Sequence, residues 1–226
     1  LDTDLYKFTT SYAYIKLFPY ALGTFSFKDR DETAYTDEFL RRLKEAVARL
    51  SEVTLTREEL EYMTKHCRFL PGVYWEWLFS FRFRPDKIDI SLDKDRHLSI
   101  EITDYLYKAT LYEVPLLAIV SEIKNQVLGN VADMDDIICK LSEKVTLSNE
   151  HRLSFSEFGT RRRFSFDVQD KVIDCLKQTA HYCTGTSNCH FAMKYGLKTM
   201  GTHPHEWFMF HGAQFGYKHA NYMALE

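Results

Sequence analysis

The stretch that decides the fold is SFSEFGTRRR, residues 154–163. It reads as a short apolar strand that ends at Gly159 and places three consecutive arginines in the following loop. The same design, an apolar piece, a Gly-Thr turn and a helix start, recurs at residues 185–188 (GTSN) and 201–207 (GTHPHEW). Strands that alternate with helices predict a parallel sheet, and such sheets bind ligands at the carboxyl ends of their strands. The three turns, which carry Arg, Ser/Asn and His, are therefore the candidate site.

Residues 1–114 are expected to form an α+β domain that precedes these repeats. Helices are predicted over residues 2–17, with Asp2 or Thr3 as the cap, over 37–50, and from the capping box at residues 56–59. Alternating apolar residues predict an antiparallel hairpin. The expected strands are residues 22–28, 81–84, 88–92, 98–102 and 105–112. The aromatic run at residues 74–79 is interpreted as core packing rather than as a stacking platform.

Residues 115–150 are expected to be a helical linker. Pro115 suits the first turn of an apolar helix over residues 116–127, and a second amphipathic helix is predicted over about 134–141. Residues 151–226 would then be the first part of an α/β domain. The chain starts without Met and stops inside an apparent helix, so we expect it to be a piece of a longer protein.

Composition excludes some classes of function. The net charge of −3 argues against a nucleic-acid binder that relies on overall attraction to phosphate, although the local basic cluster suits a small anion. No apolar run reaches the roughly 18 residues of a membrane helix, and the acidic start is unlike a signal peptide. The five cysteines show no CxxC spacing, and we expect buried, reduced thiols.

The three adjacent arginines, Arg161 to Arg163, admit two interpretations. They could grip carboxylate or phosphate oxygens of a ligand, because a guanidinium binds such groups through two parallel hydrogen bonds. They could instead lie in a solvated loop, paired with acids such as Glu157 and Asp167. Phe158, just before the glycine, could present a ring for stacking or fill the core.

The other two turns also admit two interpretations each. At residues 185–188, amides at the start of a helix ending at Gly196 could bind an anion, or Ser187 or Asn188 could simply cap the helix. In the third turn, His203 and His205 on a strand would share a face and could bind a metal. Pro204 favours a helix start instead, which would put His205 in the first turn.

Several motifs together resemble the nicotinate phosphoribosyltransferase family. They are DTDLYK (2–7), YEVPLLAIVSE (112–122), EFGTRRRFS (157–165), GTSN (185–188) and GTHPHEW (201–207). The resemblance implies an irregular α/β barrel, here incomplete, preceded by an α+β domain. It implies an ATP-dependent ligase or glycosyltransferase of NAD salvage that makes nicotinate mononucleotide from nicotinate and 5-phosphoribosyl 1-diphosphate. A cytoplasmic homodimer with shared active sites is implied, with Mg²⁺ accompanying the diphosphate and no metal site of the protein's own.

The resemblance also assigns roles to residues. His205 matches the phosphorylated histidine that couples ATP hydrolysis to the reaction. The matching substrate-binding residues are Tyr6, Phe158, Arg161, Ser187, Asn188 and Thr202. Tyr6, which spacing alone marks as a half-buried aromatic, would reach the pyridine ring in the partner subunit's site, Phe158 would stack on the other ring face, and Arg161 would bind the anionic substrates. A serine at 187 avoids a negative charge beside the carboxylate of nicotinate.

The family's second barrel half, with an Asp-Ser-Gly-Asp segment and a glycine-rich phosphate loop, would lie beyond Glu226. Two other functions stay open at this point. One is a metal-dependent barrel hydrolase that uses His203 and His205, and the other is an inactive fragment or paralogue.

Overall fold

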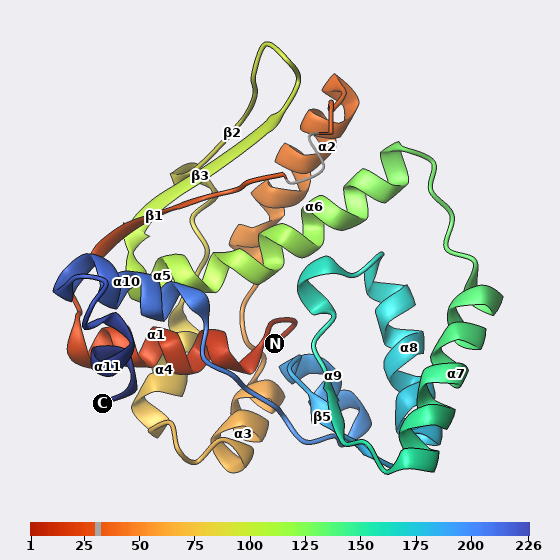
Figure 1. The fold of residues 1–226 in the computed structure, drawn as a ribbon. Helices are drawn as coiled ribbons and strands as arrows, with labels where there is room; N and C mark the ends of the chain where they lie inside the picture. Colours follow the sequence, from red (N-terminus) through yellow and green to blue (C-terminus); the bar gives the residue numbers. More distant parts are fainter. Residues whose placement is uncertain (30–32) are drawn as a thin grey trace.

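The computed structural model describes residues 1–29 and 33–226 (Figure 1). The helices are α1 (Leu5–Leu17), α2 (Asp37–Ala48), α3 (Arg57–His66), α4 (Gly72–Ser80), α5 (Leu106–Ala109), α6 (Glu113–Val127), α7 (Met134–His151), α8 (Phe166–Thr179), α9 (Cys189–Tyr195), α10 (His205–Phe215) and α11 (Ala220–Leu225). The strands are β1 (Leu22–Ser26), β2 (Ile88–Leu92), β3 (Leu98–Tyr105), β4 (Phe155–Glu157) and β5 (Cys183–Thr186). Short 3₁₀ turns are η1 (Arg49–Glu52), η2 (Pro85–Lys87), η3 (Thr110–Tyr112) and η4 (Thr160–Arg162).

The first sheet is antiparallel, in the order β1-β3-β2, and confirms the predicted hairpin. Every second residue of β3 is buried, because successive side chains of a strand point to opposite faces. The buried face packs with apolar residues of α2 and α6 in one core. In Figure 1 these two helices lie along one side of the sheet.

Two of the expected strands are wrong. Residues 81–84 form no strand; the rings of Phe81 and Phe83 pack against Tyr112, the latter with centroids 4.8 Å apart. Beyond Tyr105 the chain turns into α5 and η3 instead of continuing β3. After this turn Leu106 packs directly over Gly23, where a Cβ would come within 2.3 Å of its Cδ2, so the packing of α5 on β1 requires a glycine at this position.

The second core lies around α1, α3 and α4. The aromatic run forms α4, with Trp75 fully buried against Phe8, which confirms the core interpretation. The capping box at Thr56 and Glu59 is present at the start of α3. Helix α1, however, is capped at Asp4 rather than Asp2 or Thr3.

The second sheet carries the Gly-Thr turns. Strands β4 and β5 are parallel, an isolated bridge joins Thr186 to Thr199, and helices α8, α9 and α10 follow in turn. The predicted alternation of strand and helix is therefore confirmed, as a mixed α/β arrangement. Within residues 1–29 and 33–226 the strands do not close into a barrel. Helix α7 is longer than predicted and runs to His151, where a left-handed Arg152 ends it.

Gly185 is the glycine on which the second turn depends. Its φ is +152°, and a Cβ would lie 2.1 Å from the carbonyl oxygen of Lys198. We expect Gly185→Ala to lower the free energy of unfolding by about 2–4 kcal/mol, through backbone strain and overpacking. Gly72→Ala is the control, because no atom lies within 4 Å of its added Cβ, and it should change stability by less than about 1 kcal/mol. Equal denaturation midpoints for the two variants would contradict the turn geometry.

Candidate functional site

The amino-terminal segment, residues 1–7, is the element around which the three turns gather. In Figure 1 the amino terminus lies between the α1–α4 group and the group that contains β5 and α9. The backbone amide of Leu5 donates to the carbonyl of Ser187 at 2.8 Å. The amides of Cys189 and His190, in the first turn of α9, donate to the carbonyls of Thr3 and Leu1 at 3.0 and 3.1 Å.

These contacts decide between the two interpretations of the second turn, because they argue against an anion bound at the start of α9. Its first amides are already occupied by the amino-terminal carbonyls, and the Asn188 side chain accepts from the amide of Phe191 at 3.1 Å. Asn188 is thus the cap, the alternative that the sequence left open. Ser187 and Asn188 are fully buried, and both side chains bond to groups within the chain.

Arg163 is held by Asp2. Two nitrogens of the Arg163 guanidinium donate to the two Asp2 carboxylate oxygens at 2.7 Å each, and Asn188 donates to the same carboxylate at 2.7 Å. Burial by itself raises the pKa of Asp2, but the hydrogen bond and charge of Arg163 outweigh it and hold that pKa below its usual value. Arg163 is therefore paired with an acid of the chain, as the second interpretation supposed, but the acid is Asp2, and the Arg163 side chain is largely buried rather than solvated.

Asp4 joins the second turn to Tyr6. The Ser187 hydroxyl donates to Asp4 at 2.6 Å, and Tyr6 also bonds this carboxylate. Burial raises the pKa of Asp4, which is 3% exposed, above its usual value. The pKa of Tyr6 is raised by burial and by the nearby charges of Asp4 and Glu113, so its phenol stays protonated. Tyr6 is 8% exposed, which agrees with the aromatic burial that spacing suggested.

Arg161 belongs to a second charge cluster, whose centre is Lys7. A guanidinium nitrogen of Arg161 donates to Glu113 at 2.7 Å, and the other carboxylate oxygen of Glu113 accepts from the Lys7 ammonium. Lys7 also donates to Glu206 at 2.8 Å. The partner of Arg161 is thus Glu113 rather than Glu157 or Asp167. The Arg161 side chain is 40% exposed, so donors remain available to a ligand.

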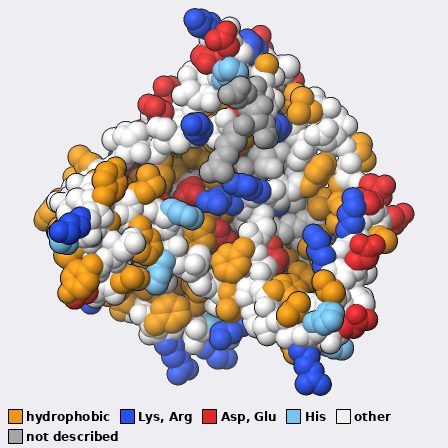
Figure 2. Space-filling view, in the orientation of Figure 1, with side chains coloured by type: hydrophobic (Ala, Val, Ile, Leu, Met, Phe, Trp, Pro, Cys, Tyr) orange, Lys and Arg blue, Asp and Glu red, His pale blue; other side chains and the backbone are white. Residues whose placement is uncertain are grey.

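Glu206 connects this cluster to the third turn. Pro204 precedes α10 and His205 is its first residue, so the strand geometry needed for a His203–His205 metal pair is not formed. His205 and Thr202 are exposed, and so is Phe158, at 44%. Figure 2 shows acidic, basic and histidine side chains gathered in the middle of one face, between its left-hand and right-hand parts.

The residues predicted for the site thus separate into two groups. Those of the amino-terminal segment and the GTSN turn are buried and already bonded: Tyr6, Ser187 and Asn188. Those that face solvent at least in part are Phe158, Arg161, Thr202 and His205. The ion pairs Arg161–Glu113, Lys7–Glu113 and Lys7–Glu206 link Arg161 to the first turn of α10, where Glu206 follows His205.

Over the part of the chain that the structure describes, no group of three or more His, Cys, Asp or Glu could hold a metal ion. None of the helices formed by those same residues is long and apolar enough to cross a bilayer. Of the five cysteines, all unpaired, only Cys67 and Cys189 are buried as predicted; Cys139 is exposed and the others are half-buried.

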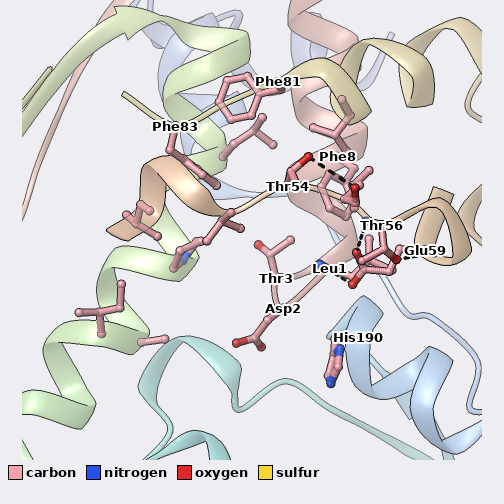
Figure 3. A pocket seen from close by; sticks show the side chains of 18 of the residues that line it. Leu1, Asp2, Thr3, Phe8, Thr54, Thr56, Glu59, Phe81, Phe83 and His190 are labelled. Carbon is pink, nitrogen blue, oxygen red and sulfur yellow. Dashed lines mark hydrogen bonds and ion pairs between the residues drawn. The ribbon is translucent and has the colours of Figure 1, made fainter. Parts of the chain in front are cut away.

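An apolar pocket of about 390 Å³ lies on another side of the amino-terminal segment. Asp2 and Thr3 face it in Figure 3, with Phe81 and Phe83 on one side and His190 on the other. The charged residues of its lining include Asp2 and Arg163, which neutralise each other. This pocket therefore lacks the free cationic donors that phosphorylated ligands need.

Comparison with known proteins matches the sequence to one family. A model of the nicotinate phosphoribosyltransferase N-terminal domain matches residues 1–121, and the model of the nicotinate phosphoribosyltransferase family matches residues 153–226. The chain belongs to the nicotinate phosphoribosyltransferase family. All the turns described above fall inside the matched ranges.

Relatives and solved structures agree with this membership. The nicotinate phosphoribosyltransferase of Chromohalobacter salexigens is 41% identical over the whole chain, and that of Methanosarcina acetivorans is 36% identical. A crystal structure of the Porphyromonas gingivalis nicotinate phosphoribosyltransferase superposes with a TM-score of 0.96 at 46% identity, over 99% of this chain. A putative nicotinate phosphoribosyltransferase from Saccharomyces cerevisiae gives 0.90 at 29% identity, again over 99%. The chain spans 58% of the Chromohalobacter, Porphyromonas and Saccharomyces proteins and 60% of the Methanosarcina one.

Sequence reasoning missed three residues that connect the parts of the candidate site to one another. Lys7, Glu113 and Glu206 all stood inside the recognised motifs, but none was assigned a role. The available signal was Lys7 itself, a lysine between Tyr6 and Phe8 in the part of α1 that is buried. A lysine is almost never fully buried unless it is paired with an acid.

Arg163 and Arg162 form a matched pair for testing the Asp2 contact, because Arg162 is exposed. We expect Arg163→Met to lower the free energy of unfolding by about 2–4 kcal/mol at pH 7, and Arg162→Met to change it little. The loss should shrink as pH falls below the ordinary Asp value of 3.8, because the lowered pKa of Asp2 contributes stability only while its carboxyl is ionised. Denaturant titrations at several pH values measure this. Equal losses for both variants would contradict the assignment.

Proposed function

We propose that the protein containing this chain is a nicotinate phosphoribosyltransferase. It makes nicotinate mononucleotide and diphosphate from nicotinate and 5-phosphoribosyl 1-diphosphate in NAD salvage, with ATP hydrolysis coupled through a phosphohistidine. The observation that carries the proposal is the chain of charges from Arg161 through Glu113 and Lys7 to Glu206, in a member of this family. It links the partly exposed Arg161 guanidinium to Glu206, the residue that follows His205 in the first turn of α10.

Charge is the main demand of this reaction. Nicotinate and phosphoribosyl diphosphate are both anions, and their mutual repulsion must be offset while they are held together. Arg161 suits this task, because Glu113 fixes one side of its guanidinium and leaves other donors for oxygen ligands. The pyridine nitrogen then bonds to the anomeric carbon, and the departing diphosphate takes the electron pair of the broken C–O bond.

His205 is proposed as the residue that receives the γ-phosphoryl group of ATP. As the first residue of α10 it lies where the positive end of the helix dipole favours added negative charge. Its imidazole is exposed, so ATP can approach it. Hydrolysis of the phosphohistidine would release phosphate and complete the coupling.

The other substrate-binding residues take graded roles in this proposal. Phe158 and Thr202, both exposed, would contact nicotinate directly, Phe158 by stacking on the pyridine ring. Tyr6, which is 8% exposed in this chain, would reach the pyridine ring in the partner subunit's site. Ser187 and Asn188 would act indirectly. Their side chains bond to Asp4 and Asp2, and these bonds fix the buried residues that form the floor of the site.

The finer architecture is also proposed. Residues 1–114 would form the α+β domain, 115–150 the helical linker and 151–226 the first part of an irregular α/β barrel. The protein would act as a cytoplasmic homodimer with shared sites. Mg²⁺ would accompany the diphosphate, whose oxygens are ligands of the kind that this ion prefers.

The histidine assignment has a direct test with a close control. In the full-length protein incubated with ATP labelled in the γ-phosphate, we expect His205→Asn to lose protein-bound label and ATP-stimulated formation of nicotinate mononucleotide. His203→Asn, two residues away and also exposed, should keep both. Acid-labile, base-stable label counted on the purified protein gives the readout. Label that persists in His205→Asn, or disappears only in His203→Asn, would reassign the phosphorylated residue.

A further inference from the structure

Lys7 is a buried charge with partners from three separate segments. Its side chain is 1% exposed, and it lies in the first turn of α1, between Tyr6 and Phe8. The ammonium donates to Glu113 at the start of α6, to Glu206 in the first turn of α10 at 2.8 Å, and to Thr110 of η3 at 3.4 Å. These three donations use all the protons of the ammonium.

The cluster around Lys7 balances its charges. Lys7 and Arg161 carry two positive charges, and Glu113 and Glu206 carry two negative charges when ionised. Glu206 bonds Thr110 as well, so its position is fixed from two sides. Because Lys7 lies between the two carboxylates, its removal would leave them facing each other in a largely buried place, where like charges repel strongly.

Other ionisable groups also face the cluster. From α1 these are Tyr6, whose ring centroid lies 5.4 Å from the Lys7 ammonium, and Tyr14, which senses the charge of Glu206. Burial raises the pKa of Tyr14, so both phenols stay neutral near pH 7. Asp4 lies further away, beside Tyr6 and Arg161. The acids that respond to loss of Lys7 are therefore Glu113 and Glu206.

We propose that Lys7 is a positioning residue that fixes the spacing between the anion-binding Arg161 and the first turn of α10, where His205 lies. It does so by pinning Glu113, the support of Arg161, and Glu206, the neighbour of His205, to one ammonium. This inference rests on the proposed function of the site. Lys7 touches no substrate in this role, since its ammonium is enclosed by protein groups.

The pH response separates positioning from mere support of the fold. In the parent protein burial raises the pKa of Glu206. The pKa of Glu113 is lowered, because the charges and hydrogen bonds of Lys7 and Arg161 outweigh the effect of burial. Without Lys7 the pair loses its shared positive charge, so one carboxyl holds its proton to a higher pH. At low pH that proton bridges the two acids. As pH rises both ionise, repel each other and move α10 away from Arg161.

The experiment compares Lys7→Met with Lys16→Met in the full-length protein. Lys16 lies on the same helix but is exposed. For Lys7→Met we expect kcat/KM for nicotinate mononucleotide formation to fall about 10- to 100-fold relative to the parent at pH 8, and less at pH 5.5. Lys16→Met should follow the parent at every pH. The double variant Lys7→Met/Glu206→Gln, which removes the repelling charge, should give a ratio to the parent that no longer changes with pH.

A second variant keeps the inference testable where Lys7→Met does not fold. Glu206→Gln retains Lys7 on Glu113, so the KM for phosphoribosyl diphosphate should stay within about twofold of the parent while the rate of His205 labelling falls about tenfold. An unchanged labelling rate would overturn the positioning role, and so would a pH-independent ratio for a folded Lys7→Met. A parent protein that makes no nicotinate mononucleotide would instead refute the proposed function, so the two failures are distinguishable.

Discussion

The structure depends on charges of the amino-terminal segment that cannot remain buried alone. Asp4 and Lys7 are almost completely enclosed, and Asp2 is partly so. An isolated buried charge is very costly, whereas a paired and hydrogen-bonded one is tolerated. Each of these three side chains is therefore tied to a different part of the chain: Asp2 to Arg163, Asp4 to Ser187, and Lys7 to Glu113 and Glu206. The segment thereby ties all three Gly-Thr turns to α1.

This arrangement supports the proposed anion site, because residues that look redundant in sequence have different surroundings. The three adjacent arginines lie in three different environments. Arg161 pairs with Glu113 on one side, Arg162 is exposed, and Arg163 pairs with Asp2. The buried Arg163 fixes the amino-terminal segment through Asp2, whereas the more exposed Arg161 keeps donors that are free to bind a ligand. Fixed groups beneath exposed donors would suit the proposed reaction between two anions, because little reorganisation is then required as charge develops.

Sequence reasoning predicted what depends on neighbouring residues. The capping box at Thr56, the hairpin of β2 and β3, the parallel β4–β5 pair and the helix stop at Gly196 all follow from local patterns. It failed where distant contacts decided the outcome. Residues 105–112 have the composition of a strand, yet the chain enters α5 and η3 after Tyr105, and Leu106 packs over Gly23 of β1, far away along the chain. The amides of α9 appeared open in sequence, because nothing local shows that Leu1 and Thr3 occupy them.

The same limit applied to the ion pairs. Nearby acids such as Glu157 and Asp167 were reasonable partners for the arginines, but the actual partners, Glu113 and Asp2, are 48 and 161 positions away along the chain. A motif identifies which residues matter without showing which ones touch. Lys7, inside the recognised DTDLYK motif, is the clearest case.

The central claim is that the exposed donors of Arg161 and the turn at His205 serve one ligand site above a floor fixed by the amino-terminal segment. A crystal structure of the full-length protein with nicotinate and phosphoribosyl diphosphate tests it most directly. The account predicts that bound ligand lies in contact with both Arg161 and the turn at 202–205, while Lys7 still bridges Glu113 and Glu206. Ligand bound elsewhere, for example in the apolar pocket beside Phe81, with Arg161 and His205 on separate surfaces, would contradict it.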